Sequence, residues 1–220
     1  MILDMNLQEL TEYVKEHGQP SYRAKQLYEG CILGKNLEEI SNLPKSFKDE
    51  IEKDFPKYEV VAHLFSDDGT QKVALKLFDG SIVESVLLKY KYGYTVCVST
   101  QVGCRMGCKF CASTLNGLQR NLSAGEILLQ ILFFNRFLGG TLKERKVTNV
   151  VLMGCGEPLD NYENVTKFLK LVSDENGLNI SQRNISLSTC GIVPNIYKLA
   201  DDGFSVTLTI SLHAPNDELR

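Results

Sequence analysis

The stretch YTVCVSTQVGCRMGCKFCAST, residues 94–114, joins a predicted β-strand to a cysteine-rich loop. Its first seven residues have the β-branched and apolar character of a strand. Three cysteines follow the strand: Cys104, Cys108 and Cys111. Gly103 and Gly107 lie among them, and glycine is poor inside a helix but favourable in a loop that wraps a ligand. We therefore expect the strand to end in a loop that presents three thiols together.

Strand and helix patterns alternate after this loop. A capping box of Ser123 and Glu126 marks the start of a helix, and the next strand, 147–154, is nearly continuous in apolar residues. Four such alternations predict an α/β fold with a parallel sheet, either doubly wound or part of a barrel. Four strands do not close a barrel, so we expect a C-terminally truncated piece or an edge that something else covers. The expected strands are 94–100, 147–154, 183–189 and 205–213, and the expected helices are 123–137, 161–177 and 193–203.

Two smaller units are expected before this α/β unit, which we assign to residues 93–220. Residues 1–56 carry helical patterns and predict a small helical domain, with Pro44 at the first position of its third helix. Residues 57–92 change to period two and predict a β extension of two or three antiparallel strands. The helical patterns lie near 7–18, 21–33 and 42–55, and the strand patterns at 58–66, 71–78 and 81–90.

Composition limits the possible settings and partners. The chain has 220 residues, is 43% apolar and has a formal net charge of −3, so any contact with nucleic acid must rest on a local basic patch. Seven cysteines, an odd number, follow no secretory signal, which favours reduced thiols in a cytoplasmic protein. The longest apolar run, 127–140, is too short and too polar to span a membrane.

Each strand of the α/β unit is followed by an unusual polar or glycine-rich segment. In parallel α/β folds and barrels, the C-terminal ends of the strands line the active site. We therefore expect these four segments to converge on one site. The segments are GCRMGCKFC at 103–111, GCGEP at 154–158, STCG at 188–191 and SLHAPND at 211–217.

Three thiols at this spacing allow three interpretations. On a helix they would form one buried apolar face, which Gly103 and Gly107 disfavour. A structural zinc needs four ligands, and Cys155, Cys190 or His213 would have to supply the fourth. A cluster of four irons ordinarily has four cysteine ligands, so three cysteines leave one iron open to another ligand.

The motifs resemble a known family. The Cys-x3-Cys-x2-Cys spacing is similar to the signature of radical S-adenosylmethionine enzymes, in which the cofactor occupies the open iron of a 4Fe–4S cluster. Four segments of the α/β half and two N-terminal segments together resemble the RNA methyltransferase family of RlmN and Cfr. The segments are TVCVSTQVGCRMGCKFCAST (95–114), MGCGEPLDNYENV (153–165), LSTCGIVP (187–194), SLHAPNDELR (211–220), YRAKQLYE (22–29) and NLPK (42–45).

The resemblance implies roles for individual residues. Cys97 would be a catalytic cysteine that helps remove the ring proton and resolves a covalent protein–RNA adduct, and Glu84 would be a proton acceptor. From the residues alone, both are ordinary strand positions, and His213 could equally be a structural histidine. The implied cluster ligands are Cys104, Cys108 and Cys111, and the implied cofactor-binding residues are Gly156, Glu157, Ser188, Ser211, Leu212 and His213.

The resemblance also implies a reaction and an architecture. The expected fold is the first four units of a partial (β/α)6-type barrel. The expected activity, by way of a methylated cysteine near the family's C-terminus, is methylation of carbon 2 of adenine in 23S rRNA and tRNA. Methylation of carbon 8, as in Cfr, is the alternative among enzymes, and a zinc-stabilised RNA-binding module is the alternative among non-enzymes. We expect the 220 residues alone not to complete methyl transfer, because that methyl-carrying cysteine is not among them.

Two residues differ from the family's usual pattern, and several binding partners are expected. Cys155 and Cys190 stand where the family often has Met and Ser, and each adds a thiol near the expected cluster. An electron donor such as flavodoxin is implied, no membrane is expected, and we expect a monomer. The candidate RNA contacts are Arg105, Lys109, Arg120 and the KERK run at 143–146, with Tyr90, Tyr92 and Tyr94 as candidates for base stacking; for KERK a solvated surface is favoured.

Overall fold

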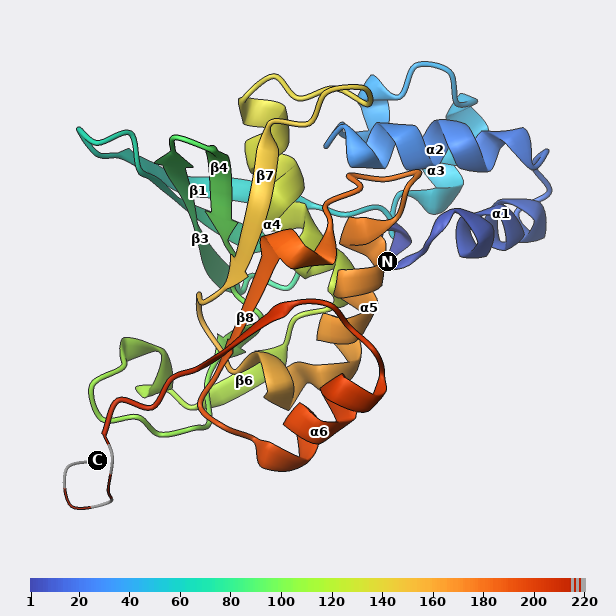
Figure 1. Cartoon of the computed structure of the whole chain (residues 1–220). Helices are drawn as coiled ribbons and strands as arrows, with labels where there is room; N and C mark the ends of the chain where they lie inside the picture. The colour runs from blue at the N-terminus through green and yellow to red at the C-terminus, as the bar shows by residue number, and fades with distance from the viewer. Residues whose placement is uncertain (215, 217, 219–220) are drawn as a thin grey trace.

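The computed structural model describes residues 1–214, 216 and 218. Within these residues the main sheet has seven strands in the order β1-β2-β3-β4-β7-β8-β9, and a second sheet pairs β5 with β6 (Figure 1). The strands are β1 (Tyr58–Phe65), β2 (Gln71–Leu77), β3 (Ile82–Tyr90), β4 (Gly93–Cys97), β5 (Gln101–Gly103), β6 (Leu118–Asn121), β7 (Val147–Leu152), β8 (Ile185–Thr189) and β9 (Thr207–Ile210).

Helices cover one side of this sheet and form the N-terminal part of the chain (Figure 1). The α-helices are α1 (Leu7–Glu16), α2 (Tyr22–Ile32), α3 (Lys45–Ile51), α4 (Ala124–Phe137), α5 (Tyr162–Ser173) and α6 (Val193–Asp201). The short 3-10 helices are η1 (Ile2–Asp4), η2 (Leu37–Glu39), η3 (Ala112–Thr114), η4 (Pro158–Asn161) and η5 (Gln182–Asn184).

The strand directions confirm the α/β fold. Strands β4, β7, β8 and β9 are parallel neighbours, and α4, α5 and α6 connect them in turn. Strands β1 to β4 are antiparallel, and Val86 of β3 pairs with Cys97 of β4. The β extension therefore continues the same sheet instead of forming a separate one. The proposed domain boundaries at 56 and 92 stay a prediction.

Three details differ from the expectations or lie beyond the description. The short strands β5 and β6 bracket the cysteine loop and were not expected. Pro44 is the residue before α3, not its first helical residue. We expected Asp217 and Glu218 to begin another helix; residue 217 lies outside the described residues, and Glu218 lies in a turn.

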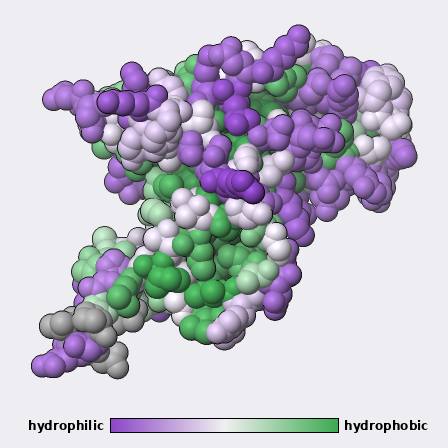
Figure 2. All heavy atoms as spheres, in the orientation of Figure 1, coloured by the Kyte–Doolittle hydropathy of each residue, from purple (hydrophilic) through white to green (hydrophobic). Residues whose placement is uncertain are grey.

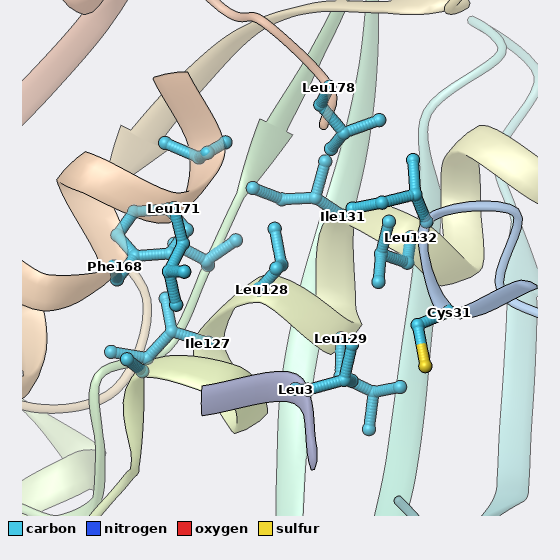
Figure 3. Close-up of a cluster of buried hydrophobic side chains, with 14 of the residues drawn as sticks. Leu3, Cys31, Ile127, Leu128, Leu129, Ile131, Leu132, Phe168, Leu171 and Leu178 are labelled. Carbon is cyan, nitrogen blue, oxygen red and sulfur yellow. The ribbon is translucent and has the colours of Figure 1, made fainter. Parts of the chain in front are cut away.

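The core lies between the sheet, α4, α5 and the N-terminal helices (Figure 3). Helix α4 buries side chains around most of its circumference, including Ile127, Leu128 and Ile131, because it has neighbours on several sides. Its first turn is held by the expected capping box, in which Ser123 and Glu126 bond reciprocally, and the Gly125 amide also donates to Asp4. These bonds anchor η1 and α4 to each other and fix the end of α4 beside the cysteine loop.

The face of the molecule in Figure 2 has a polar part and an apolar part. Figure 2 shows polar side chains over the N-terminal helices and hydrophobic side chains over the part of this face where β9 and α6 lie in Figure 1. The large exposed apolar residues of α6 and β9 are Val193, Tyr197, Leu208 and Ile210. In the described part of the chain, no helix is both long enough and apolar enough to cross a bilayer.

Candidate active site

The cysteine loop is an irregular loop, as expected. Residues 104–111 form bends and turns, and Gly103 and Gly107 both have positive φ, +76° and +72°. A Cβ on Gly103 would lie 1.9 Å from the carbonyl oxygen of Gly117, so only glycine allows the two ends of the loop to approach this closely. The interpretation of the three cysteines as one face of a helix is therefore wrong.

The four polar segments meet at one cavity of about 300 Å³. The cavity lies at the C-terminal ends of β7, β8 and β9, as the parallel sheet predicts. Leu212 follows β9 but does not line the cavity, and its side chain is 61% exposed. The lining residues that the sequence singled out are Cys104, Cys108, Cys111, Gly156, Glu157, Ser188, Cys190, Ser211 and His213.

Glu157 is the buried acid of this cavity, with only 4% of its surface exposed. Its Oε1 accepts a hydrogen bond from the amide of Leu159 at 3.0 Å, and its Oε2 accepts one from the amide of Cys190 at 2.8 Å. The bond from Cys190 joins the segment after β7 to the segment after β8, and the bond from Leu159 holds the carboxylate against its own segment. A carboxylate can accept about four hydrogen bonds, so each oxygen keeps capacity for a donor inside the cavity.

Gln101 holds this acid in place and was missed by the sequence reasoning. Its side chain is fully buried, and its Oε1 accepts from the amide of Glu157 at 2.8 Å. Its Nε2 donates to Asn121 Oδ1 and to Asp160 Oδ2, both at 2.8 Å. Asp160 in turn is paired with Arg105, which directly follows Cys104: the single N–H of Nε is shared between both carboxylate oxygens, and Nη2 donates to Oδ1. One amide therefore links Glu157 to both ends of the cysteine loop.

No local pattern marks Gln101, because its partners lie 20 to 59 positions away in the sequence. The sequence feature that comes closest to indicating Gln101 is Gly156, because it belongs to the glycine-rich segment GCGEP and packs against Gln101. Gly156 has a φ of +103°, and a Cβ there would lie 2.6 Å from the Cβ of Gln101. Glycine at this position lets the two segments pack together.

Cys97 and Glu84 lie on one face of the sheet, outside the lining of the cavity. Cys97 is opposite Val86, and Glu84 is two residues along β3, so the two side chains are diagonal neighbours. Burial raises the pKa of the Cys97 thiol, although a hydrogen bond from the Met153 amide opposes this. Glu84 is exposed and forms an ion pair with Lys72 at 2.7 Å. Their catalytic roles stay a prediction.

The two additional thiols have different surroundings. The thiol of Cys155 donates to the Gly103 carbonyl at 3.6 Å and does not line the cavity. Cys190 lines it, and burial, followed by the negative charge of Glu157, raises the pKa of its thiol to about 12. All seven cysteines of the chain are free thiols.

Some candidate RNA-binding residues are bonded within the protein, and others are exposed. Arg120 donates two hydrogen bonds to Glu126, at 2.7 and 2.8 Å, and one to Asp79 at 2.6 Å. Arg145 of the KERK run donates to the carbonyls of residues 178 and 179. Lys109 is exposed. The candidates for base stacking include an exposed pair, Tyr90 and Tyr92, whose rings stack at 5.0 Å.

The donor chemistry of the cavity fits an iron–sulfur cluster. Such clusters are bound by cysteine thiolates, and three free thiols from one glycine-containing loop line one cavity here. Within the part of the chain that the structure describes, no three His, Cys, Asp or Glu side chains converge closely enough to hold a single metal ion.

Comparisons with known proteins identify similar sequences and a similar fold. Residues 98–220 match the family model of the radical SAM superfamily. A relative from Clostridium botulinum (strain Alaska E43 / Type E3) is named probable dual-specificity RNA methyltransferase RlmN; it is 53% identical over the whole of this chain, which covers 63% of the relative. A relative of the same name from Clostridium tetani is 47% identical, with 100% and 62% covered.

A solved structure shares the fold. The crystal structure of a radical SAM methyltransferase from Sphaerobacter thermophilus matches with a TM-score of 0.91 and 39% sequence identity, covering 99% of this chain and 65% of that chain. The chain thus spans somewhat less than two thirds of the length of the proteins that it resembles.

Proposed function

The chain belongs to the radical SAM superfamily, and we propose that it carries the cluster and cofactor site of an RNA methyltransferase. In this proposal Cys104, Cys108 and Cys111 bind a 4Fe–4S cluster, and S-adenosylmethionine binds beside it. The observation that carries the proposal is the cavity that these three thiols line together with the buried Glu157. The printed names of the relatives support the methyltransferase activity.

The chain's own residues would bind and orient the cofactor. When bound, the cluster and S-adenosylmethionine supply radical chemistry through one-electron cleavage of the sulfonium. Glu157 is held by two backbone amides, so its remaining lone pairs are oriented to accept hydrogen bonds from an ammonium group. Ser188 and Ser211, whose hydroxyl oxygens are 2.7 Å apart, offer further polar contacts at the same cavity. Gly156 and His213 also line it, whereas Leu212 would contribute from its edge.

Proton transfer would fall to the sheet face that carries Cys97 and Glu84. Burial favours the protonated thiol of Cys97, so a base must remove its proton before the sulfur acts as a nucleophile. Glu84 is a diagonal neighbour of Cys97 and can be that base once it leaves Lys72. The proposed roles are thus proton acceptor for Glu84 and nucleophile for Cys97.

The proposed substrate is an adenine of 23S rRNA and tRNA, methylated at carbon 2. Nucleoside mass spectrometry of both RNAs, from the host organism with and without the gene, tests this position. Loss of 2-methyladenosine is the expected result, and loss of 8-methyladenosine alone would favour the carbon-8 alternative. A reducing, cytoplasmic setting is supported by the seven free thiols; the flavodoxin-like electron donor and the monomeric state stay predictions.

The metal content tests the site itself. The protein is reconstituted anaerobically with iron and sulfide, and its iron and zinc are measured. Electron paramagnetic resonance spectra of the reduced protein are then recorded with and without S-adenosylmethionine. We expect about four irons per chain and a spectrum that changes on adding the cofactor. Bound zinc without a cluster would instead support the zinc-stabilised RNA-binding module.

A further inference from the structure

We propose that Cys190 is a resident fourth ligand of the cluster, which occupies the iron left open by the three-cysteine loop until S-adenosylmethionine displaces it. The inference rests on the proposed cluster at Cys104, Cys108 and Cys111. It assigns a function to a thiol that departs from the serine often found at this position of the family.

Cys190 and the three cysteines of the loop line the same cavity. Cys190 follows β8, whereas the loop lies between β5 and β6, and both line the cavity of about 300 Å³. A second, smaller cavity of about 180 Å³ is also lined by Cys190 and, from the loop, by Cys108. The same two thiols therefore border both spaces into which a bound group can extend.

The position of Cys190 is fixed by the acid of the site. Its amide donates to Oε2 of Glu157 at 2.8 Å, and the amide of Gly191 donates to the hydroxyl of Thr189 at 3.1 Å. These bonds hold the backbone at Cys190 and Gly191, and the thiol of Cys190, which also hydrogen-bonds the Glu157 carboxylate, lines the cavity. Glu157 accepts the amide hydrogen bond of Cys190, so a cofactor that binds Glu157 would bind directly beside Cys190.

The other cysteines are not placed for this role. Cys31 is buried among the N-terminal helices, and Cys97 lies on the sheet face next to Met153. The thiol of Cys155 is directed to the carbonyl of Gly103. Among the described side chains, Cys190 is the remaining thiol at the cavity. His213 also lines the cavity, with its ring held against Phe110 at a centroid distance of 4.6 Å.

Ligation by Cys190 requires no oxidant or reductant. The S–H bond breaks, an S–Fe bond forms, and the proton goes to solvent, as for any thiol that binds a metal. Clusters of four irons ordinarily have four cysteine ligands, so this state completes the usual set. When the cofactor binds, the S–Fe bond breaks and the thiolate regains a proton. The thiol therefore competes with the cofactor. The apparent dissociation constant of the cofactor is its intrinsic value divided by the fraction of clusters whose fourth iron is open.

The test compares Cys190→Ala with Cys155→Ala, which removes a nearby thiol that does not line the cavity. Both variants are reconstituted anaerobically, and their reduced spectra and affinities for S-adenosylmethionine are measured. We expect Cys190→Ala to change the cofactor-free spectrum and to bind the cofactor at least about threefold more tightly, which corresponds to a thiolate that occupies two thirds of the clusters. Cys155→Ala should resemble the unmodified protein in both measurements.

Alkylation of the unmodified holoprotein gives a result that needs no variant. Iodoacetamide labelling followed by mass spectrometry should show Cys190 protected without the cofactor and reactive with it. Two results would overturn this inference while the protein still takes up iron: equal labelling of Cys190 with and without the cofactor, or equal spectra and cofactor affinities for Cys190→Ala and Cys155→Ala. Either result would leave the proposed function standing. Absence of an iron–sulfur cluster would overturn the proposed function, and the role of Cys190 with it.

Discussion

Replacing Gln101 by methionine tests whether one buried amide joins the cysteine loop to the acid of the site. Methionine keeps the unbranched shape that the close approach to Gly156 requires and removes all three hydrogen bonds of the amide. The amide of Glu157 then loses its partner, at a cost of about 1–3 kcal/mol, and Asp160 loses a bond to a charged group, worth about 1.5–3 kcal/mol. We expect a total loss of roughly 3–5 kcal/mol in the free energy of unfolding.

The matched control is Gln130→Met, since Gln130 is also fully buried. Its amide bonds the backbone nitrogen and oxygen of Ser99, each at 2.9 Å, and makes no contact with Glu157 or Asp160. Both variants should lower the global stability measured by denaturant unfolding of the cluster-free protein. Only Gln101→Met should also raise hydrogen exchange in residues 104–121, because its amide holds Asn121 and, through Asp160, Arg105.

The two measurements can contradict the reasoning separately. A loss of less than about 1 kcal/mol for Gln101→Met would mean that the amide's partners find replacements, contrary to the cost of unpaired buried groups. Equal loss of exchange protection in the cysteine loop for Gln130→Met would mean that the loop responds to general destabilisation. Either result would contradict the conclusion that Gln101 positions Glu157.

Three further predictions concern the loop, an ion pair and the core. Gly103→Ala should prevent full cluster loading, measured as iron per chain, because its Cβ would overlap the carbonyl of Gly117 at 1.9 Å; normal loading would contradict the loop geometry. The hydrogen bond from Arg120 lowers the pKa of Asp79 from 3.8 to about 2, so its stabilisation is present above about pH 4 and lost as the pH falls to about 2; melting temperatures should show this loss in the parent protein and less of it in Asp79→Asn. Phe168→Ala should cost about 3–5 kcal/mol of stability, measured by denaturant unfolding, since its side chain is fully buried.

The sequence predicted the elements well where a pattern was long and local. The capping box of Ser123 and Glu126 predicted the start of α4, and the alternation of strand and helix predicted that β4, β7, β8 and β9 are parallel, although not their order. It did not reveal that β3 pairs with β4, because pairing between units depends on contacts and not on the pattern of either strand. Strands β5 and β6, of three and four residues, are too short for period two to be recognised.

The location of the candidate site could be predicted from the sequence, but the hydrogen bonds that hold its residues could not. Strand ends of a parallel sheet lie at one edge, so Cys104, Glu157 and Ser188 were expected together, and the cavity contains all three. The amide of Gln101 could not be identified in this way, because a buried amide has no signature until its partners are known. The same reason explains why Arg120, expected at the surface for RNA, is bonded to Glu126 and Asp79.

The two faces of the sheet explain why core and site can be built from the same strands. In β8, Ile185 and Leu187 are fully buried, whereas Ser186 and Ser188, which alternate with them, are only partly covered. The registers of β4, β7 and β8 place Cys97 on the face that carries these serines. Because side chains alternate with a period of two, helices cover the apolar face and leave the polar one for ligands. A one-residue slip of β8 would bury its serines and expose its core residues, so the packing that stabilises the fold also fixes the orientation of the site.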